Sequence, residues 1–125
     1  MKILIVDDSG VMRRIHVNAL KEHNIEDADI IEAEDGAKAL EIARSEEISL
    51  FMLDWNMPKL DGLALVKKLR AMDNYKATPI IMITSEAAKY NVVEAVKSGV
   101  TNYVVKPIHG NLIWEKIGKY LTGKG

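Results

Sequence analysis

Polar side chains able to bind a metal ion or a phosphoryl group follow four short apolar runs of the sequence. Two carboxylates, Asp7 and Asp8, come after the first of these runs, and Asp54 comes after the second. The hydroxyl of Thr84 follows the third run, and the ammonium group of Lys106 follows the fourth. Carboxylates and water are the ligands that Mg²⁺ prefers, and a carboxylate can itself act as a nucleophile and form an acyl phosphate. These residue types indicate Mg²⁺-dependent phosphoryl chemistry if the fold brings them together.

The apolar runs themselves predict β-strands. Ile3–Val6, Leu50–Leu53 and Ile80–Ile83 are apolar throughout, which is typical of parallel strands covered by helices on both faces. Ala28–Ala33 and Asn102–Val105 contain polar residues, and we predict that they form the two edge strands, where such mixing is tolerated.

Five segments with helical periodicity alternate with these strands. The first is expected to begin after an N-cap at Ser9 and to bury Met12, Ile15, Ala19 and Leu20. The apolar faces of the other four contain, in chain order, Ala37, Leu40 and Ala43; Leu65, Val66, Leu69 and Met72; Ala88, Val92, Ala95 and Val96; and Ile113, Ile117, Tyr120 and Leu121.

The alternation of five strands and five helices predicts an α/β fold built on a doubly wound, five-stranded parallel sheet. Both Rossmann-like and flavodoxin-like windings fit this pattern. Five strands favour the flavodoxin-like order 2-1-3-4-5, which places the three apolar strands at the centre. Because parallel strands end on the same side of a sheet, the three carboxylates, Thr84 and Lys106 should converge on one cleft.

Composition limits the class of protein. The 125 residues, 48% of them hydrophobic, suit a single domain spanning residues 1–125. The net charge of −1 argues against nucleic-acid binding driven by overall charge. There is no cysteine for a disulfide scaffold or a thiolate zinc site. The four apolar residues before Asp7 are too few for a secretory signal or a membrane span. A cytoplasmic protein with no membrane partner is therefore expected.

Several short motifs in their observed order are similar to those of a known family. They are Ile5–Ser9, Met12–Ile15, Asp54–Pro58 with Asp61-Gly62, Ile83–Glu86, and Tyr103 with Lys106-Pro107. Over essentially its whole length the sequence resembles the receiver domain of two-component response regulators, and most of all the single-domain members that act in chemotaxis.

This resemblance implies a role for each matching residue. Asp54 would accept a phosphoryl group from the phosphohistidine of a sensor histidine kinase. Asp8 and Asp54 would bind Mg²⁺ directly, Asp7 would bind it through water, and the backbone carbonyl of Asn56 would be a further ligand. Lys106 would contact the phosphoryl group.

The resemblance also implies a switch and a control of hydrolysis. Thr84 would move toward the phosphoryl group, and Tyr103 would rotate inward behind it. Asn56 and Glu86, two residues beyond Asp54 and Thr84, are expected to flank the path of the attacking water and to keep the phosphorylated state short-lived.

The function implied is a phosphorylation-activated signalling switch and not an enzyme, although it would phosphorylate itself from small phosphodonors with Mg²⁺ and would dephosphorylate itself. Its partners would be a histidine kinase and a downstream target protein, with a flagellar motor switch as one candidate, and a phosphatase is left open. Trp55–Met57, the spacing of Thr84 and Glu86, and Tyr103 favour chemotaxis. A phosphorelay shuttle would share every active-site residue.

Two other classes of protein fit the sequence less well. Mg²⁺-dependent phosphohydrolases of the haloacid dehalogenase type separate their two aspartates by one residue and carry a cap, whereas Asp7 and Asp8 are adjacent and no cap is present. A flavodoxin-type electron carrier would have a Ser-, Thr- and Gly-rich loop after its first strand, where Asp7 and Asp8 would instead repel the flavin phosphate.

Overall fold

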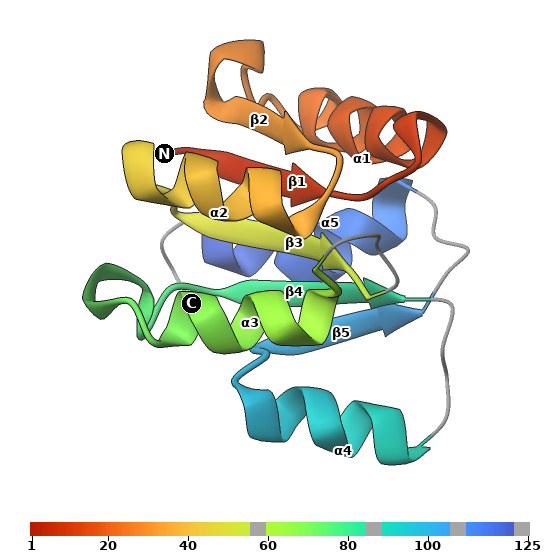
Figure 1. Cartoon of the computed structure of the whole chain (residues 1–125). Coiled ribbons are helices and arrows are strands. Elements are labelled where there is room, and N and C mark those ends of the chain that lie inside the picture. Colours follow the sequence, from red (N-terminus) through yellow and green to blue (C-terminus); the bar gives the residue numbers. More distant parts are fainter. Residues whose placement is uncertain (56–59, 85–88, 106–109, 122–125) are drawn as a thin grey trace.

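Strands and helices alternate along the chain (Figure 1). The structure is a computed structural model and describes residues 1–55, 60–84, 89–105 and 110–121. The strands are β1 (Ile3–Val6), β2 (Ile30–Ala33), β3 (Leu50–Asp54), β4 (Ile80–Thr84) and β5 (Asn102–Val105). The helices are α1 (Gly10–Glu22), α2 (Gly36–Ser45), α3 (Gly62–Arg70), α4 (Lys89–Ser98) and α5 (Gly110–Leu121). Two short 3₁₀ helices, η1 (Asp27–Asp29) and η2 (Asp73–Tyr75), precede β2 and β4.

The five strands form one parallel sheet in the order β2-β1-β3-β4-β5. This order confirms the flavodoxin-like winding and the placement of the two mixed runs at the edges. The register pairs Val6 of β1 with Leu53 of β3, and Asp54 of β3 with Ile83 of β4. The carboxyl ends of the central strands therefore lie at the same edge of the sheet, toward which all the arrowheads in Figure 1 point.

Helices cover both faces of the sheet, and each face has its own apolar core. On the face of α2 and α3, alternate strand residues such as Leu4 and Leu53 are buried, together with Leu65 of α3. On the face of α1 and α5, the intervening residues Ile5 and Met52 are buried. This burial on both faces is why the central strands are apolar throughout.

Helix α1 differs from the expectation in the residues that it buries. Ile15 is 38% exposed, whereas His16 is only 1% exposed. The buried residues of α1 are His16, Ala19 and Leu20. Ala19 and Leu20 lie three and four residues after His16, so the three share one face of the helix. This face passes through His16 and not through Ile15 as expected. The Ser9 cap is confirmed, because its Oγ accepts the backbone N–H of Met12 at 3.2 Å.

Two element boundaries also differ from the expectation. Residues 28 and 29 belong to η1 and not to β2, because the N–H of Asp29 bonds the carbonyl of Glu26 in a tight turn. Helix α3 ends at Arg70, so Met72 precedes η2 and lies outside the helix. Met72 still packs against the core from this position.

Polar side chains brace the end of the sheet where the strands begin. The Tyr75 hydroxyl lies 2.7 Å from the carbonyl oxygens of Ala43 and Glu46, and the guanidinium of Arg70 donates to the carbonyls of Tyr75, Thr78 and Gly99. Burial lowers the pKa of Arg70 from its ordinary value. These bonds connect α2, α3 and the segment after α4 at the end opposite to the aspartates.

In the part of the chain that the structure describes, no helix is both long and apolar enough to cross a membrane.

Candidate functional site

Three carboxylates gather at the carboxyl end of the sheet. One carboxylate oxygen each of Asp7, Asp8 and Asp54 lies within 4.8 Å of the other two. Asp54 is the last residue of β3, and Asp7 and Asp8 follow β1 directly. Val6 of β1 and Leu53 of β3 are register partners in this parallel pair. The pairing at the centre of the sheet therefore also brings the aspartates that follow them together.

The three aspartates differ in their exposure to solvent. Asp7 is 1% exposed and Asp54 is 7% exposed, whereas Asp8 is open to solvent. The carboxylate of Asp7 accepts the backbone N–H of Ser9 at 2.9 Å. The same serine caps α1 through its side chain, so the start of α1 and the orientation of Asp7 are set by one turn.

Two glycines allow close backbone contacts at the starts of α2 and α3. A Cβ atom at Gly62 would overlap the carbonyl oxygen of Asp54, and one at Gly36 would overlap the carbonyl oxygen of Leu60. The N–H of Gly62 also donates to the carbonyl of Trp55 at 2.8 Å. Gly62 therefore lets α3 begin directly against the backbone of Asp54, and Gly36 lets α2 begin against that of Leu60.

Each of these glycines follows an aspartate that caps its helix. Asp35 accepts the N–H of Lys38 at 2.8 Å at the start of α2, and Asp61 accepts the N–H of Ala64 at 2.8 Å at the start of α3. From the sequence, Asp61-Gly62 was identified only as part of a family motif, and the cap at Asp35 was not predicted. The repeated Asp-Gly dipeptide was a signal that could have revealed both caps.

The carboxylate cluster is electrostatically unfavourable by itself. At 4.8 Å two negative charges repel by roughly 3 kcal/mol at an effective dielectric constant of about 20, and solvent screens the pairs that involve exposed Asp8. A hard cation relieves this repulsion. The donor set fits Mg²⁺, because its ligands are all carboxylate oxygens and the open side at Asp8 leaves room for the waters that this ion retains.

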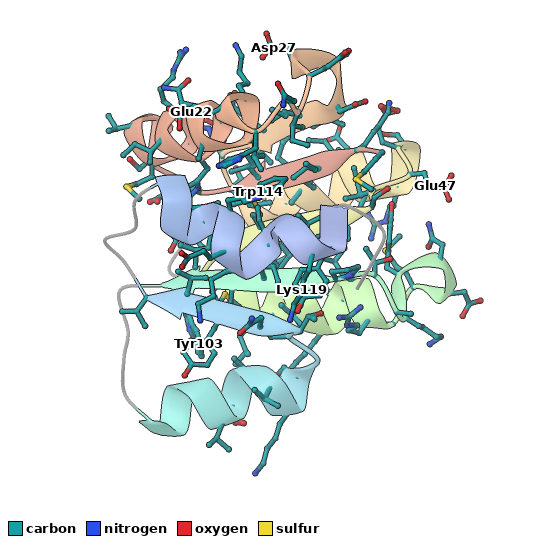
Figure 2. All side chains as sticks on the ribbon, turned by 180° about the vertical axis from the view of Figure 1, so that it is seen from behind. Glu22, Asp27, Glu47, Tyr103, Trp114 and Lys119 are labelled. Atoms are coloured by element: carbon teal, nitrogen blue, oxygen red, sulfur yellow. The ribbon has the colours of Figure 1, made fainter. Side chains whose placement is uncertain are left out.

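Two further residues of the expected site lie on neighbouring strands. Thr84 is the last residue of β4 and pairs in register with Val105 of β5. Tyr103 pairs with Met82, two residues earlier on the same strands, and is half-buried. Figure 2 shows its side chain extending from β5 toward α4. A hollow of about 310 Å³ lies beside it, lined by residues 102–105 and Lys116.

Three residues of the expected site, Asn56, Glu86 and Lys106, lie outside the described residues. Their proposed roles as metal ligand, hydrolysis control and phosphoryl contact stay predictions. Among the predicted metal ligands that the structure describes, Asp7, Asp8 and Asp54 are brought together as expected.

Comparison with known proteins agrees with this fold and geometry. Residues 3–118 match the family model described as the response regulator receiver domain. The chain therefore belongs to the receiver domains of two-component response regulators, a class of phosphorylation-activated signalling switches. This membership separates it from the phosphohydrolases and electron carriers considered from the sequence.

Within that class the chain is similar to chemotaxis proteins. It is 45% identical to a chemotaxis protein CheY homolog of Campylobacter jejuni, over the whole of this chain and 96% of the relative. It is 47% identical to chemotaxis protein CheY1 of Helicobacter pylori over 94% of each chain. The solved structure of CheY4 of Vibrio cholerae superposes with a TM-score of 0.88, at 31% identity over 95% of this chain and 97% of that one.

The repulsion among the carboxylates predicts that removing one of them stabilises the metal-free protein. Asp8→Asn removes two of the three repelling pairs, so we expect the free energy of unfolding in a chelator to rise by about 1–2 kcal/mol after screening by solvent. Saturating Mg²⁺ should narrow this difference, because the ion stabilises the parent more than the variant. Urea unfolding with and without Mg²⁺ measures both effects.

Asp73→Asn is the control, because the Asp73 side chain is fully exposed and lies in η2. Its stability should change by no more than about 0.5 kcal/mol under either condition. Equal behaviour of the two variants would show that the carboxylates do not repel measurably.

Proposed function

We propose that this chain is a chemotaxis response regulator that accepts a phosphoryl group on Asp54, with Mg²⁺ held by Asp7, Asp8 and Asp54 and by the backbone carbonyl of Asn56. The observation that carries the proposal is the convergence of three carboxylates within 4.8 Å at the carboxyl ends of β1 and β3. Asp54 is the nucleophile of the three, because it ends the central strand between the aspartate pair and β4.

The transfer is a substitution at phosphorus. A carboxylate oxygen of Asp54 attacks the phosphorus of a phosphohistidine, the P–N bond breaks, and the imidazole leaves with a proton from solvent. Small donors such as acetyl phosphate react in the same way through their P–O bond. Mg²⁺ held by the three aspartates would supply positive charge that offsets the charge of the phosphoryl group during transfer. Lys106 holds another phosphoryl oxygen through its ammonium group.

The phosphorylated state is read by a partner through Thr84 and Tyr103. Thr84 ends β4, and the register places it diagonally from Tyr103 on β5. The hydroxyl of Thr84 bonds the phosphoryl oxygens, and Tyr103 then turns inward to take the space that it leaves. Because Tyr103 borders the hollow between β5 and Lys116, its rotation changes the surface offered to a downstream target.

Chemotaxis is favoured over a phosphorelay by the relatives, which are named as chemotaxis proteins. In this role the phosphodonor is a histidine kinase, the target belongs to the flagellar motor switch, and the protein acts in the cytoplasm. A fast response requires that the phosphoryl group be lost quickly, and we assign this control to Asn56 and Glu86.

The first test concerns Asp54. Incubation with acetyl phosphate and Mg²⁺ should add one phosphoryl group that is labile to base and hydroxylamine, because an acyl phosphate is reactive toward nucleophiles. Asp54→Asn should abolish it, and Asp73→Asn should not, because Asp73 is fully exposed in η2, which precedes β4 at the other end of the sheet. Mass spectrometry before and after hydroxylamine measures the product. A phosphoserine or phosphohistidine in its place would contradict the assignment.

The second test concerns the switch. Thr84→Ala should still bind the phosphoryl mimic beryllofluoride with Mg²⁺, but the ring resonances of Tyr103 should no longer shift on binding, because coupling requires an element with two states that the site can bias. The matched variant Thr78→Ala, at the other end of the sheet, should retain the shift. An unchanged Tyr103 shift in Thr84→Ala would exclude Thr84 as the link.

The third test separates chemotaxis from slower signalling. Asn56→Lys combined with Glu86→Leu should block the path of water and slow the loss of the phosphoryl group at least about tenfold. Decay is followed after removal of the donor, in Mg²⁺ and without a phosphatase. The same two substitutions at exposed positions, Asn18→Lys with Glu47→Leu, should leave the rate unchanged. Equal decay of both double variants would remove the support for a short-lived signal.

A further inference from the structure

The side chain of Arg13 joins three elements beside the carboxylate cluster. It projects from α1, its Nη1 donates to the carbonyl oxygen of Asp7 at 2.6 Å, and its Nε donates to Glu32 Oε1 of β2 at 3.0 Å. Its side chain is 20% exposed and that of Glu32 is 48% exposed. An ion pair this open to solvent adds little to stability, so its consequence lies in the orientation that it gives the guanidinium.

The carbonyl that Arg13 binds belongs to the peptide group between Asp7 and Asp8. A peptide group is planar, so the direction of this carbonyl also sets the directions in which the two flanking residues leave the plane. The other polar groups of Asp7 are bonded as well, because its N–H donates to the carbonyl of Ala33 at 3.2 Å and its carboxylate accepts the N–H of Ser9 at 2.9 Å. The bond from Arg13 acts on the plane of the peptide that joins the two acids.

We propose that Arg13 is a positioning residue for the metal site, holding the Asp7–Asp8 peptide so that both carboxylates face Asp54. Glu32 contributes by orienting the guanidinium from the edge strand. This inference rests on the proposed binding of Mg²⁺ by the three aspartates. In this role Arg13 and Glu32 act through the Asp7–Asp8 peptide and do not touch the metal ion.

The charge of Arg13 and its positioning role act on Mg²⁺ in opposite directions. A guanidinium near the site repels a divalent cation, so loss of the charge alone would strengthen metal binding. Loss of the hydrogen bond lets the peptide rotate and would weaken metal binding. The sign of the change therefore distinguishes the two effects.

The surroundings of Arg13 favour substitution without loss of the fold. A hollow of about 190 Å³ lies against Arg13 and Glu32, bordered also by Ala33, Glu34 and Lys38. A shorter side chain at this position leaves space that water can enter and does not create a dry cavity. The next residue, Arg14, is exposed and carries the same charge, which makes it a matched control.

The test is titration of the 125-residue chain with Mg²⁺ alone. Binding is monitored by tryptophan emission, to which Trp55 beside Asp54 contributes, and by the amide resonances of Asp7 and Asp8. Arg13→Gln should raise the dissociation constant for Mg²⁺ about tenfold or more, as removal of a group that orients a metal ligand commonly does. Arg14→Gln should change it less than about twofold, because exposed charges are screened.

Arg13→Lys keeps the charge and removes the planar fork that bonds Asp7 and Glu32 together. It should also weaken Mg²⁺ binding, and it provides the test if Arg13→Gln does not fold. Tighter binding by Arg13→Gln, or unchanged binding by both Arg13 variants, would overturn the inference while leaving the proposed function intact. A parent protein that binds no Mg²⁺ would instead contradict the proposed function itself.

Discussion

The parallel pairing of β1 with β3 forces three like charges together at one end of the sheet. Val6 and Leu53 are register partners, so the residues that follow them, Asp7 and Asp54, lie side by side. Asp8 comes next along the chain and joins the same cluster. The apolar core on both faces stabilises this pairing. It thus holds the acids at a separation that their mutual repulsion opposes. The three carboxylates therefore lie close enough to repel one another, and a cation bound among them would relieve that repulsion.

The two ends of the sheet differ in how their polar groups are satisfied. At the end where the strands begin, Arg70 and Tyr75 bond backbone carbonyls of several segments and connect them. At the other end, Asp7, Asp8 and Asp54 bring three carboxylates within 4.8 Å of one another, beside the bonds that Ser9 and Arg13 make to Asp7. This division suits a switch, because a change of charge at the carboxylate end can shift nearby groups while the bonds at the other end hold the segments together.

Small residues and caps determine how precisely the acids are placed. Gly62 lets α3 begin against the backbone of Asp54, and Ser9 joins Asp7 to the start of α1. Arg13 then reaches across from α1 to the carbonyl of Asp7 and to the edge strand. The geometry of the carboxylates thus depends on residues that never touch a metal ion, in keeping with the general importance of outer contacts at metal sites.

The sequence by itself determined the α/β alternation, the strand order and the acids at the strand ends, because apolar periodicity and turn residues are local features. The tertiary structure decided which face of α1 is buried. His16 and not Ile15 points into the interior, because α1 packs on that side against the sheet and α5. It also decided the bond from Arg13 to Asp7 and Glu32, because β2 is far along the chain and reaches Arg13 only when the sheet pairs. Local pattern specifies the elements, whereas contacts between distant segments depend on how those elements pack.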